Sequence, residues 1–390
     1  MMHADRGITI MQIINGKIIT PDAVLTDHTI VLEGDRIHAI VPAHSAPSDP
    51  DRLDAHGQWI VPGFIDVHVH GGDGNDTMDA TPTAIQAMGR FFARHGVTSY
   101  FPTTMSAPAD AIARAISNVA SCPQPQDGAQ HLGVHVEGPY LSKDFPGAQL
   151  PDVLRLPDPS EYQYWFESEV VRLITVAPEL PGALGLIDEG VRQGIEFAIG
   201  HSGASYEQVI TAADHGARQA THTYNGMLGL HHRNPGTLGG VLLEDRIYGQ
   251  IISDGIHTHP AMVKLLVRAK GTDRVILITD AIRAAGLPDG DYDLGEQPVT
   301  VRDGVCRIAN GSLAGSTATM DGVLRNVMQF TGLTLPEAIP MATSVPAKAM
   351  NLAGRKGVLQ PGADADIVLL NEAIDVQATI VCGRVVYQSS

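Results

Sequence analysis

Residues 61–80 read VPGFIDVHVHGGDGNDTMDA and decide both the fold and the place of the site. An apolar run from Val61 ends in two histidines, His68 and His70, and glycines follow before a helical pattern begins near Thr83. Because side chains two apart on a strand project from the same face, both imidazoles can converge on one ion. The stretch therefore predicts a strand that carries a pair of metal ligands at its carboxyl end.

Seven further strand-like runs follow, with helical patterns between them. The eight runs end near His68, Pro102, Glu137, Ala177, His201, His222, Asp254 and Asp280. The clearest helical patterns between them cover Thr83 to His95, Pro108 to Ser121 and Tyr206 to His215. Such alternation is typical of a parallel sheet, and eight strand-helix units favour a closed (β/α)8 TIM barrel over an open sheet.

The two ends of the chain differ from its middle. Residues 8–60 read as short strands with alternating polarity and turn punctuation, and residues 362–370 and 378–387 repeat that texture. We expect one small β-sandwich domain built from both ends, residues 1–61 and 354–390, beside a barrel domain of residues 62–353. Helical patterns over 320–331 and 336–350 lead from the last barrel strand back to it.

Composition excludes several classes of protein. A chain of 390 residues with a formal net charge of −17 and no basic run does not suit a nucleic-acid partner. No apolar run approaches the roughly 20 residues of a membrane span, and the first residues lack a secretory pattern. Cys122, Cys306 and Cys382 fit no CxxC pattern, which indicates a reducing compartment. We therefore expect a cytoplasmic protein without a membrane partner.

Six ionisable side chains lie where the predicted strands end, at the rim where barrel enzymes place their active sites. They are His68, His70, Glu137, His201, His222 and Asp280. Imidazole and carboxylate are the usual ligands of Zn²⁺ and its first-row neighbours, and a set without cysteine is typical of an open catalytic site. The pattern predicts a metal centre.

Each of these residues also has an ordinary structural interpretation. The HxH pair can be solvated or satisfied within a core, Glu137 can end a strand, and Asp280 can cap a helix. His201 can introduce the next helix, and His222 can hydrogen-bond the following turn. Independent structural roles would not place metal-competent side chains on five different strands at one rim, so we favour the metal centre.

Several motifs together carry a family resemblance. They are VPGFIDVHVHGGDGNDTMDA (61–80), HVEGPY (135–140), GHSGAS (200–205), THTYNGM (221–227), DGIHTHP (254–260), ITDA (278–281) and LAGSTATMD (313–321). Across nearly the whole chain they resemble the N-acetylglucosamine-6-phosphate deacetylases of the amidohydrolase superfamily. PGFIDxHxH indicates only the superfamily, whereas EGP, HTYN and DGIH together are typical of the family. The resemblance implies hydrolysis of N-acetyl-D-glucosamine 6-phosphate to D-glucosamine 6-phosphate and acetate, in amino sugar catabolism.

The resemblance also implies one or two divalent ions per subunit, with Zn²⁺ as the first expectation and Fe, Mn, Co or Ni as alternatives. One ion would lie among His68, His70, Glu137 and Asp280, and the other among Glu137, His201 and His222. Asp280 would be the catalytic residue, because a carboxylate there can accept the proton of the attacking water and return it to the departing amine.

Contacts with the sugar phosphate follow from the same resemblance. It places Asn225, the amide of Gly226, and Arg233 near the phosphate, and His257 at a sugar hydroxyl or phosphate oxygen. The arginine would come from a neighbouring subunit, which implies a homodimer. The segment HHRNPG (231–236) concentrates donors in an otherwise acidic chain, although Arg233 could equally be a surface arginine.

One loop departs from the family pattern. Some members place a histidine after EGP, whereas no histidine lies between Glu137 and His201 here and the loop reads FPGAQLPD. Gln149 can take that place and donate to an oxyanion or sugar group, but it carries no charge. The segment LAGSTATMD lacks the lysine of a phosphate loop, so we expect it to begin a helix and to line an acyl pocket through Leu313.

Three other functions remain open from the sequence. N-acetylgalactosamine 6-phosphate differs by one inverted hydroxyl, which need not change any motif. A deaminase or cyclic-amide hydrolase acting on a nucleobase-like ring suits the superfamily but not the phosphate-directed residues. A catalytically dead, amidohydrolase-like scaffold would normally have lost its ligands, and all six remain.

Overall fold

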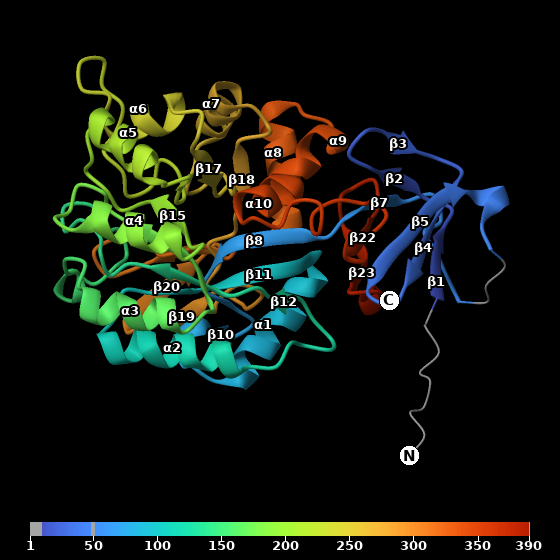
Figure 1. Ribbon diagram of the computed structural model, residues 1–390, viewed down its shortest axis with the longest axis horizontal. Helices are drawn as coiled ribbons and strands as arrows, with labels where there is room; N and C mark the ends of the chain where they lie inside the picture. Colours follow the sequence, from blue (N-terminus) through green and yellow to red (C-terminus); the bar gives the residue numbers. More distant parts are fainter. Residues whose placement is uncertain (1–9, 48–50, 390) are drawn as a thin grey trace.

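The computed structural model describes residues 10–47 and 51–389. Its centre is a parallel sheet whose eight principal strands follow the chain order around a barrel (Figure 1). They are β8 (Phe64–Val69), β11 (Val97–Thr104), β13 (Val134–Glu137), β14 (Val171–Val176), β15 (Glu196–Ile199), β16 (Gln219–Ala220), β17 (Tyr248–Ile251) and β18 (Val275–Leu277). Short β12 (Gln130–His131) pairs with β11 at its beginning. The predicted TIM barrel is confirmed.

Backbone hydrogen bonds bring the last barrel strand back to the first. The amide of Asp280 donates to the carbonyl of His68, and the amide of His70 donates to the carbonyl of Ala281, both at 2.9 Å. Since these residues follow β18 and end β8, the closure lies at the carboxyl rim. A histidine pair and an aspartate that are far apart in the sequence thus meet at the seam.

Helices cover the outside of the barrel. They are α1 (Pro82–Arg94), α2 (Ala109–Ser121), α3 (Pro159–Glu167), α4 (Ala183–Arg192), α5 (Tyr206–His215), α6 (Gly236–Leu243), α7 (Pro260–Lys270) and α8 (Met320–Thr331). Their ends carry recognisable signals: Ser205 and Gln208 form a capping box at the start of α5, and Gly216 ends that helix with a φ of 113°. The predicted helices agree with α1, α2, α5 and α8 to within two residues.

The prediction of one helix over 336–350 is wrong. The structure has α9 (Leu335–Ala338), a 3-10 turn (Ile339–Ala342) and α10 (Ser344–Ala349). Pro340 and Pro346 explain the breaks, because proline removes a backbone donor and clashes with the preceding turn. Thr343 between the two parts has φ −133° and ψ −85°, which no helix contains.

Both chain ends build two sheets at one end of the molecule, on the right in Figure 1. One sheet has the order β5 (Arg36–Pro42), β4 (His28–Glu33), β1 (Ile10–Ile14), β6 (Arg52–Asp54). The other has the order β24 (Arg384–Gln388), β23 (Val376–Val381), β22 (Ile367–Leu370), β7 (Trp59–Pro62), β2 (Lys17–Ile19), β3 (Val24–Leu25). The second sheet joins the two ends of the chain, because β22 pairs antiparallel with β7.

A separate apolar core fills these two sheets. Its fully buried members include Ile13, Ile30 and Ile60 from the beginning of the chain and Ile367 and Ile380 from its end. The predicted strand over 362–370 is shorter than expected and begins at Ile367. The domain boundaries at 61–62 and 353–354 stay a prediction, and residues 1–9 of the first segment lie outside the described residues.

A three-stranded antiparallel sheet, which was not predicted from the sequence, is inserted between β18 and α8. It contains β19 (Gly290–Leu294), β20 (Gln297–Arg302) and β21 (Val305–Arg307). Its buried side chains, Val299 and Val301 among them, pack with Met105 and Ile282 from the barrel rim. A two-stranded ribbon of β9 (Gly71–Gly72) and β10 (Asn75–Asp76) follows β8. The inserted sheet forms part of the wall of the site described below.

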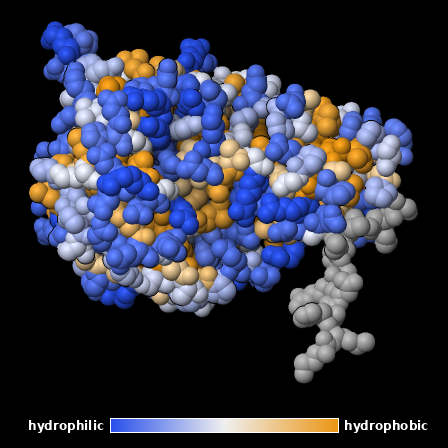
Figure 2. Space-filling view, in the orientation of Figure 1, coloured by the Kyte–Doolittle hydropathy of each residue, from blue (hydrophilic) through white to orange (hydrophobic). Residues whose placement is uncertain are grey.

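Most of the face visible in Figure 2 is hydrophilic, with apolar side chains scattered over it. Within the described ranges, no helix combines the length and the apolarity that crossing a membrane requires.

Candidate active site

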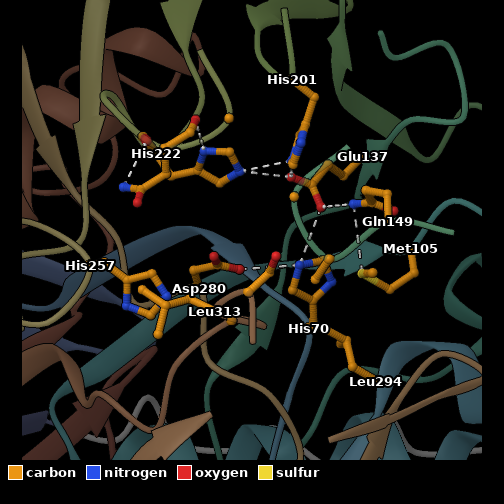
Figure 3. Close-up of a pocket in the computed structure, with 16 residues that line it drawn as sticks. His70, Met105, Glu137, Gln149, His201, His222, His257, Asp280, Leu294 and Leu313 are labelled. Carbon is orange, nitrogen blue, oxygen red and sulfur yellow. Dashed lines mark hydrogen bonds and ion pairs between the residues drawn. The ribbon is translucent and has the colours of Figure 1, made fainter. Parts of the chain in front are cut away.

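A cavity of about 290 Å³ opens at the carboxyl rim of the barrel (Figure 3). Its volume lies at the lower end of the range usual for small-molecule sites. Five of the six predicted ligands line it, namely His70, Glu137, His201, His222 and Asp280. The sixth, His68, is fully buried next to them. The barrel therefore brings the six predicted side chains to one place.

Three of these residues have strained backbone. His201, His222 and Asp280 have φ values of 46°, 29° and 49°, in the left-handed region that residues other than glycine rarely adopt. Each follows the last residue of its strand by two or three positions. Such conformations cost of order 1–3 kcal/mol each and gather at functional sites. The turn at each strand end aims the side chain at the cavity.

The bridging position belongs to Glu137 at the end of β13. Its Oε1 lies 3.1 Å from His222 Nε2 and 3.2 Å from His201 Nε2. Its Oε2 lies 3.4 Å from His70 Nε2. Oε1 also lies 3.6 Å from His68 Nε2. The carboxylate thus lies between the imidazoles that follow β15 and β16 and those of the β8 segment, and Oε1 is within reach of both groups.

Asp280 completes the group around β8. Its Oδ1 lies 3.2 Å from His70 Nε2 and 3.4 Å from His68 Nε2, and those two nitrogens are 3.3 Å apart. On the other side, His201 Nε2 and His222 Nε2 are 3.1 Å apart. Figure 3 shows the side chains of His70, Glu137, His201, His222 and Asp280 pointing toward a shared centre.

Backbone carbonyls orient three of the imidazoles through their opposite nitrogens. His70 Nδ1 lies 3.2 Å from Thr103 O, His201 Nδ1 3.0 Å from Phe145 O, and His222 Nδ1 3.2 Å from Asn225 O. A nitrogen at that distance from a carbonyl carries the proton, which leaves the lone pair on Nε2. In neutral His201 and His222, the lone pairs on Nε2 therefore face each other across 3.1 Å.

This site needs positive charge. Although burial by itself disfavours a charged imidazole, hydrogen bonds to Asp280 and Glu137 raise the pKa of His70 well above its ordinary value. Burial would likewise raise the pKa of Asp280, but the imidazoles of His68 and His70 lower it to about 2. One proton can join only two of the converging atoms, whereas one cation can bind several of them.

The donor set fits divalent metal. Ligand atoms around a tetrahedral Zn²⁺, with bonds of about 2.0–2.2 Å, lie about 3.3–3.6 Å from one another. The observed spacings of 3.1–3.6 Å are close to that range. Two groups have the required closeness: His68 with His70 and Glu137, and Glu137 with His201 and His222. The residues present could hold two ions that share the Glu137 carboxylate.

Gln149 lies against the bridging carboxylate. Its Nε2 donates to Glu137 Oε2 at 2.8 Å, and its Oε1 accepts from the backbone amide of Ser106 at 2.9 Å. Only 3% of the residue is exposed, although it lines the cavity. The amide that we expected to meet substrate is thus engaged at both ends within the protein.

The predicted sugar and phosphate contacts Asn225, Gly226 and His257 also line the cavity. His257 Nδ1 lies 2.7 Å from Asp254 Oδ2, while its Nε2 is buried and lacks a hydrogen-bond partner among the described residues. Asp254 Oδ1 accepts from the backbone amides of Ile256 and His257, at 2.8 Å each. Asp254, which the sequence reading did not select, therefore fixes an imidazole whose free nitrogen remains for a ligand.

Arg233 does not reach the cavity of its own chain. It lies in an exposed loop, where its Nη1 is 2.7 Å from His232 Nε2. Leu313 lines the cavity, and so do Met105 and Leu294, which the sequence analysis did not select. The acyl pocket stays a prediction. Leu294 comes from the inserted sheet, so only recognition of that sheet would have singled it out.

Comparison with known proteins agrees with this geometry. Residues 59–386 match the model of the amidohydrolase family, and residues 12–60 match that of the NagA composite domain. The chain is 39% identical over 388 residues to an N-acetylglucosamine-6-phosphate deacetylase of Lysinibacillus sphaericus, covering 99% of this chain and 98% of that one. It is 38% identical over 371 residues to an N-acetylgalactosamine-6-phosphate deacetylase of Escherichia coli O157:H7, covering 94% and 97%.

Solved structures give the same result. The N-acetylglucosamine-6-phosphate deacetylase of Pasteurella multocida superposes with a TM-score of 0.93 at 31% identity, covering 98% of this chain and all of that one. A mutant of the Mycobacterium smegmatis deacetylase, in complex with N-acetyl-D-glucosamine-6-phosphate, superposes with a TM-score of 0.90 at 32% identity, covering 97% and 100%. The chain therefore belongs to the amidohydrolase family.

Proposed function

We propose that this enzyme hydrolyses N-acetyl-D-glucosamine 6-phosphate to D-glucosamine 6-phosphate and acetate. The observation that carries the proposal is the meeting of four imidazoles and two carboxylates at one cavity of the barrel rim, where five of them line the cavity and His68 is buried beside them. Relatives and solved structures that match nearly the whole chain carry that activity in their names. The reaction breaks one carbon-nitrogen bond with one water and needs no other reactant.

The six converging side chains would hold one or two ions, for which we propose Zn²⁺ first. A divalent ion bound there supplies Lewis acidity, which polarises the amide carbonyl and favours deprotonation of water near neutral pH. Asp280, ionised and at the cavity wall, accepts a proton from the attacking water. The same carboxyl group then donates that proton to the departing nitrogen, so that acetate and the free amine leave.

We place the sugar phosphate in the same cavity, against Asn225, the amide of Gly226, and His257. Arg233 would add its guanidinium from a neighbouring subunit, which makes a homodimer part of the proposal. Arg233 is exposed and does not line the cavity of its own chain, and a planar guanidinium suits a phosphate.

A reducing, cytoplasmic location also belongs to the proposal. The three cysteines are unpaired, and Cys122 and Cys306 are buried. Burial raises the pKa of the Cys306 thiol to about 12, so that thiol stays protonated and unreactive.

The test is amine release by the purified, metal-loaded enzyme from four sugars: the 6-phosphates of N-acetylglucosamine and N-acetylgalactosamine and the two unphosphorylated sugars. We expect the highest kcat/KM with N-acetylglucosamine 6-phosphate and large losses without the phosphate. A clear preference for the galactosamine substrate would transfer the assignment to that reaction, which one relative carries. Equal rates with unphosphorylated sugars would contradict the phosphate site.

A further inference from the structure

The loop of residues 145–149, FPGAQ, touches the proposed metal centre at three points. The carbonyl of Phe145 holds His201 Nδ1. Gly147, with a φ of 57°, lies so close to His201 that an added Cβ would stand 2.9 Å from its Cε1. Gln149 donates to Glu137 at 2.8 Å. One short segment thus contacts both an imidazole and the carboxylate that the two candidate ion sites share.

The Glu137 carboxylate needs an external restraint. The last torsion of a glutamate side chain is broad and has no sharp preference of its own. Here its Oε1 must face His201 and His222 while its Oε2 faces His70. A rotation of the carboxylate would spoil both sets of contacts together, and the hydrogen bond from Gln149 to Oε2 opposes that rotation.

The direction of the Gln149 amide is itself fixed. Its Oε1 accepts from the backbone amide of Ser106, which follows β11, so its NH₂ group must face Glu137. The Gln149 backbone amide donates to Pro146 O at 2.8 Å, which closes the turn of the loop. The second amide hydrogen faces Met105 Sδ at 3.9 Å. Both donors are therefore directed at protein atoms, and none is left for a substrate.

We propose that Gln149 is a positioning residue for the metal centre, which holds the shared carboxylate in its bridging orientation, rather than a substrate ligand. The proposal rests on the metal centre of the proposed function, and it deepens that function by assigning the loop a role. Glutamine suits the role because its amide is a neutral donor at one end and an acceptor at the other. A neutral donor adds no charge that would compete with a cation.

Two nearly isosteric variants test the proposal. Gln149→Met keeps the volume but removes the donor, and Gln149→Glu replaces the donor by an oxygen that faces Glu137 Oε2. We expect Gln149→Met to weaken Zn²⁺ binding about 10–100-fold, as loss of groups that orient metal ligands commonly does. Gln149→Glu also removes the donor, but its negative charge attracts a cation, so we expect a smaller loss than in Gln149→Met. Titration of Zn²⁺ into metal-free protein against a chromophoric chelator measures this without any substrate.

Controls separate positioning from folding and from substrate binding. Gln193→Met, at an exposed glutamine after α4, should bind Zn²⁺ like the wild type. The thermal midpoint of each metal-free variant, followed by circular dichroism, should stay near that of the wild type. With saturating Zn²⁺, KM of Gln149→Met for the phosphorylated sugar should stay within about 3-fold, because a positioning residue acts through kcat.

Unchanged Zn²⁺ affinity in Gln149→Met would overturn the proposal. If that variant also had a raised KM for the phosphorylated sugar, Gln149 would be a substrate ligand instead. Because the titration uses no sugar, weakened binding would support the positioning role even if the enzyme proved to act on another amide. Absence of deacetylation by the wild type would contradict the proposed function alone.

Discussion

Two clusters of buried charge differ in how they are completed. In one, Lys356 Nζ lies 2.6 Å from Asp366 Oδ2 and 3.1 Å from Asp364 Oδ2, and all three side chains are at most 3% exposed. Asp366 Oδ1 accepts from the backbone amide of Cys382 at 2.9 Å, and Asp364 pairs with Arg36. In this cluster, protein donors satisfy the carboxylates.

The second cluster, formed by the six converging side chains at the barrel rim, has the opposite arrangement. Four imidazoles and two carboxylates face one another with an excess of acceptors, and no lysine or arginine is paired with Glu137 or Asp280 among the described residues. Buried charge without a protein partner is costly. The comparison teaches that a buried cluster completed by its own chain holds the fold together, whereas one left short of cations is built for a ligand.

Metal removal should have the largest effect. Treatment with a chelator should reduce hydrolysis to the background rate while far-ultraviolet circular dichroism stays nearly unchanged, because the cluster around Lys356 and the apolar cores need no ion. Adding back Zn²⁺ should restore the rate. Full activity in protein shown by elemental analysis to contain no metal would contradict the claim that the cluster at the barrel rim binds an ion.

Asp280→Asn comes next. The amide cannot accept the proton, so kcat should fall by about 10²–10⁴-fold, the usual range for loss of general acid-base catalysis. Metal content and thermal midpoint should change little, because Asn keeps an oxygen at the same place. Steady-state kinetics beside elemental analysis distinguish this outcome from simple loss of metal, and near-normal turnover would exclude Asp280 as the base.

Lys356→Met should give the converse result. Removing one partner leaves Asp364 and Asp366 buried and less compensated, so the free energy of unfolding should fall by about 3–5 kcal/mol. The kcat of the protein that remains folded should match the wild type. Urea unfolding measures the loss, and adding Asp366→Asn should recover part of it. A stable but inactive Lys356→Met variant would contradict the assignment of this cluster to the fold.

Asp254→Asn should have the smallest effect of the four. Its amide would no longer accept from His257 Nδ1, and losing a hydrogen bond to a charged group costs about 1.5–3 kcal/mol. We expect KM for the phosphorylated sugar to rise about 10-fold or more, with a smaller change in kcat. A matched assay with an unphosphorylated N-acetyl sugar should show less change; an equal loss on both sugars would place His257 elsewhere than at the phosphate.

The sequence predicted the barrel and the place of the six converging side chains because both depend on periodicity. Strand ends are visible in the chain, and the closed parallel fold brings them to one rim. The inserted sheet was not predicted, although the sequence contains the pattern of a hairpin. Val299 and Val301 lie on either side of the polar Thr300, and Asp303 and Gly304 form the turn with φ values of 51° and 72°.

Other features of the site could not be predicted from the sequence. The left-handed backbone of His201 and His222 follows from how each strand end must turn toward the cavity, which depends on neighbouring strands. The hydrogen bond from Gln149 to Glu137 joins a loop to a strand and is set by the backbone amide of Ser106. By contrast, the break in the predicted helix at Pro340 could have been predicted from the sequence, because proline interrupts a helix.

The inserted sheet between β18 and α8 contributes to the cavity differently from the barrel. It supplies Leu294 to the wall and packs against Met105, while the six converging side chains all come from the barrel. The shape of the cavity wall can therefore change through this peripheral sheet without any change in the six converging side chains. Protein engineers can graft hairpins from relatives at this position for the same reason.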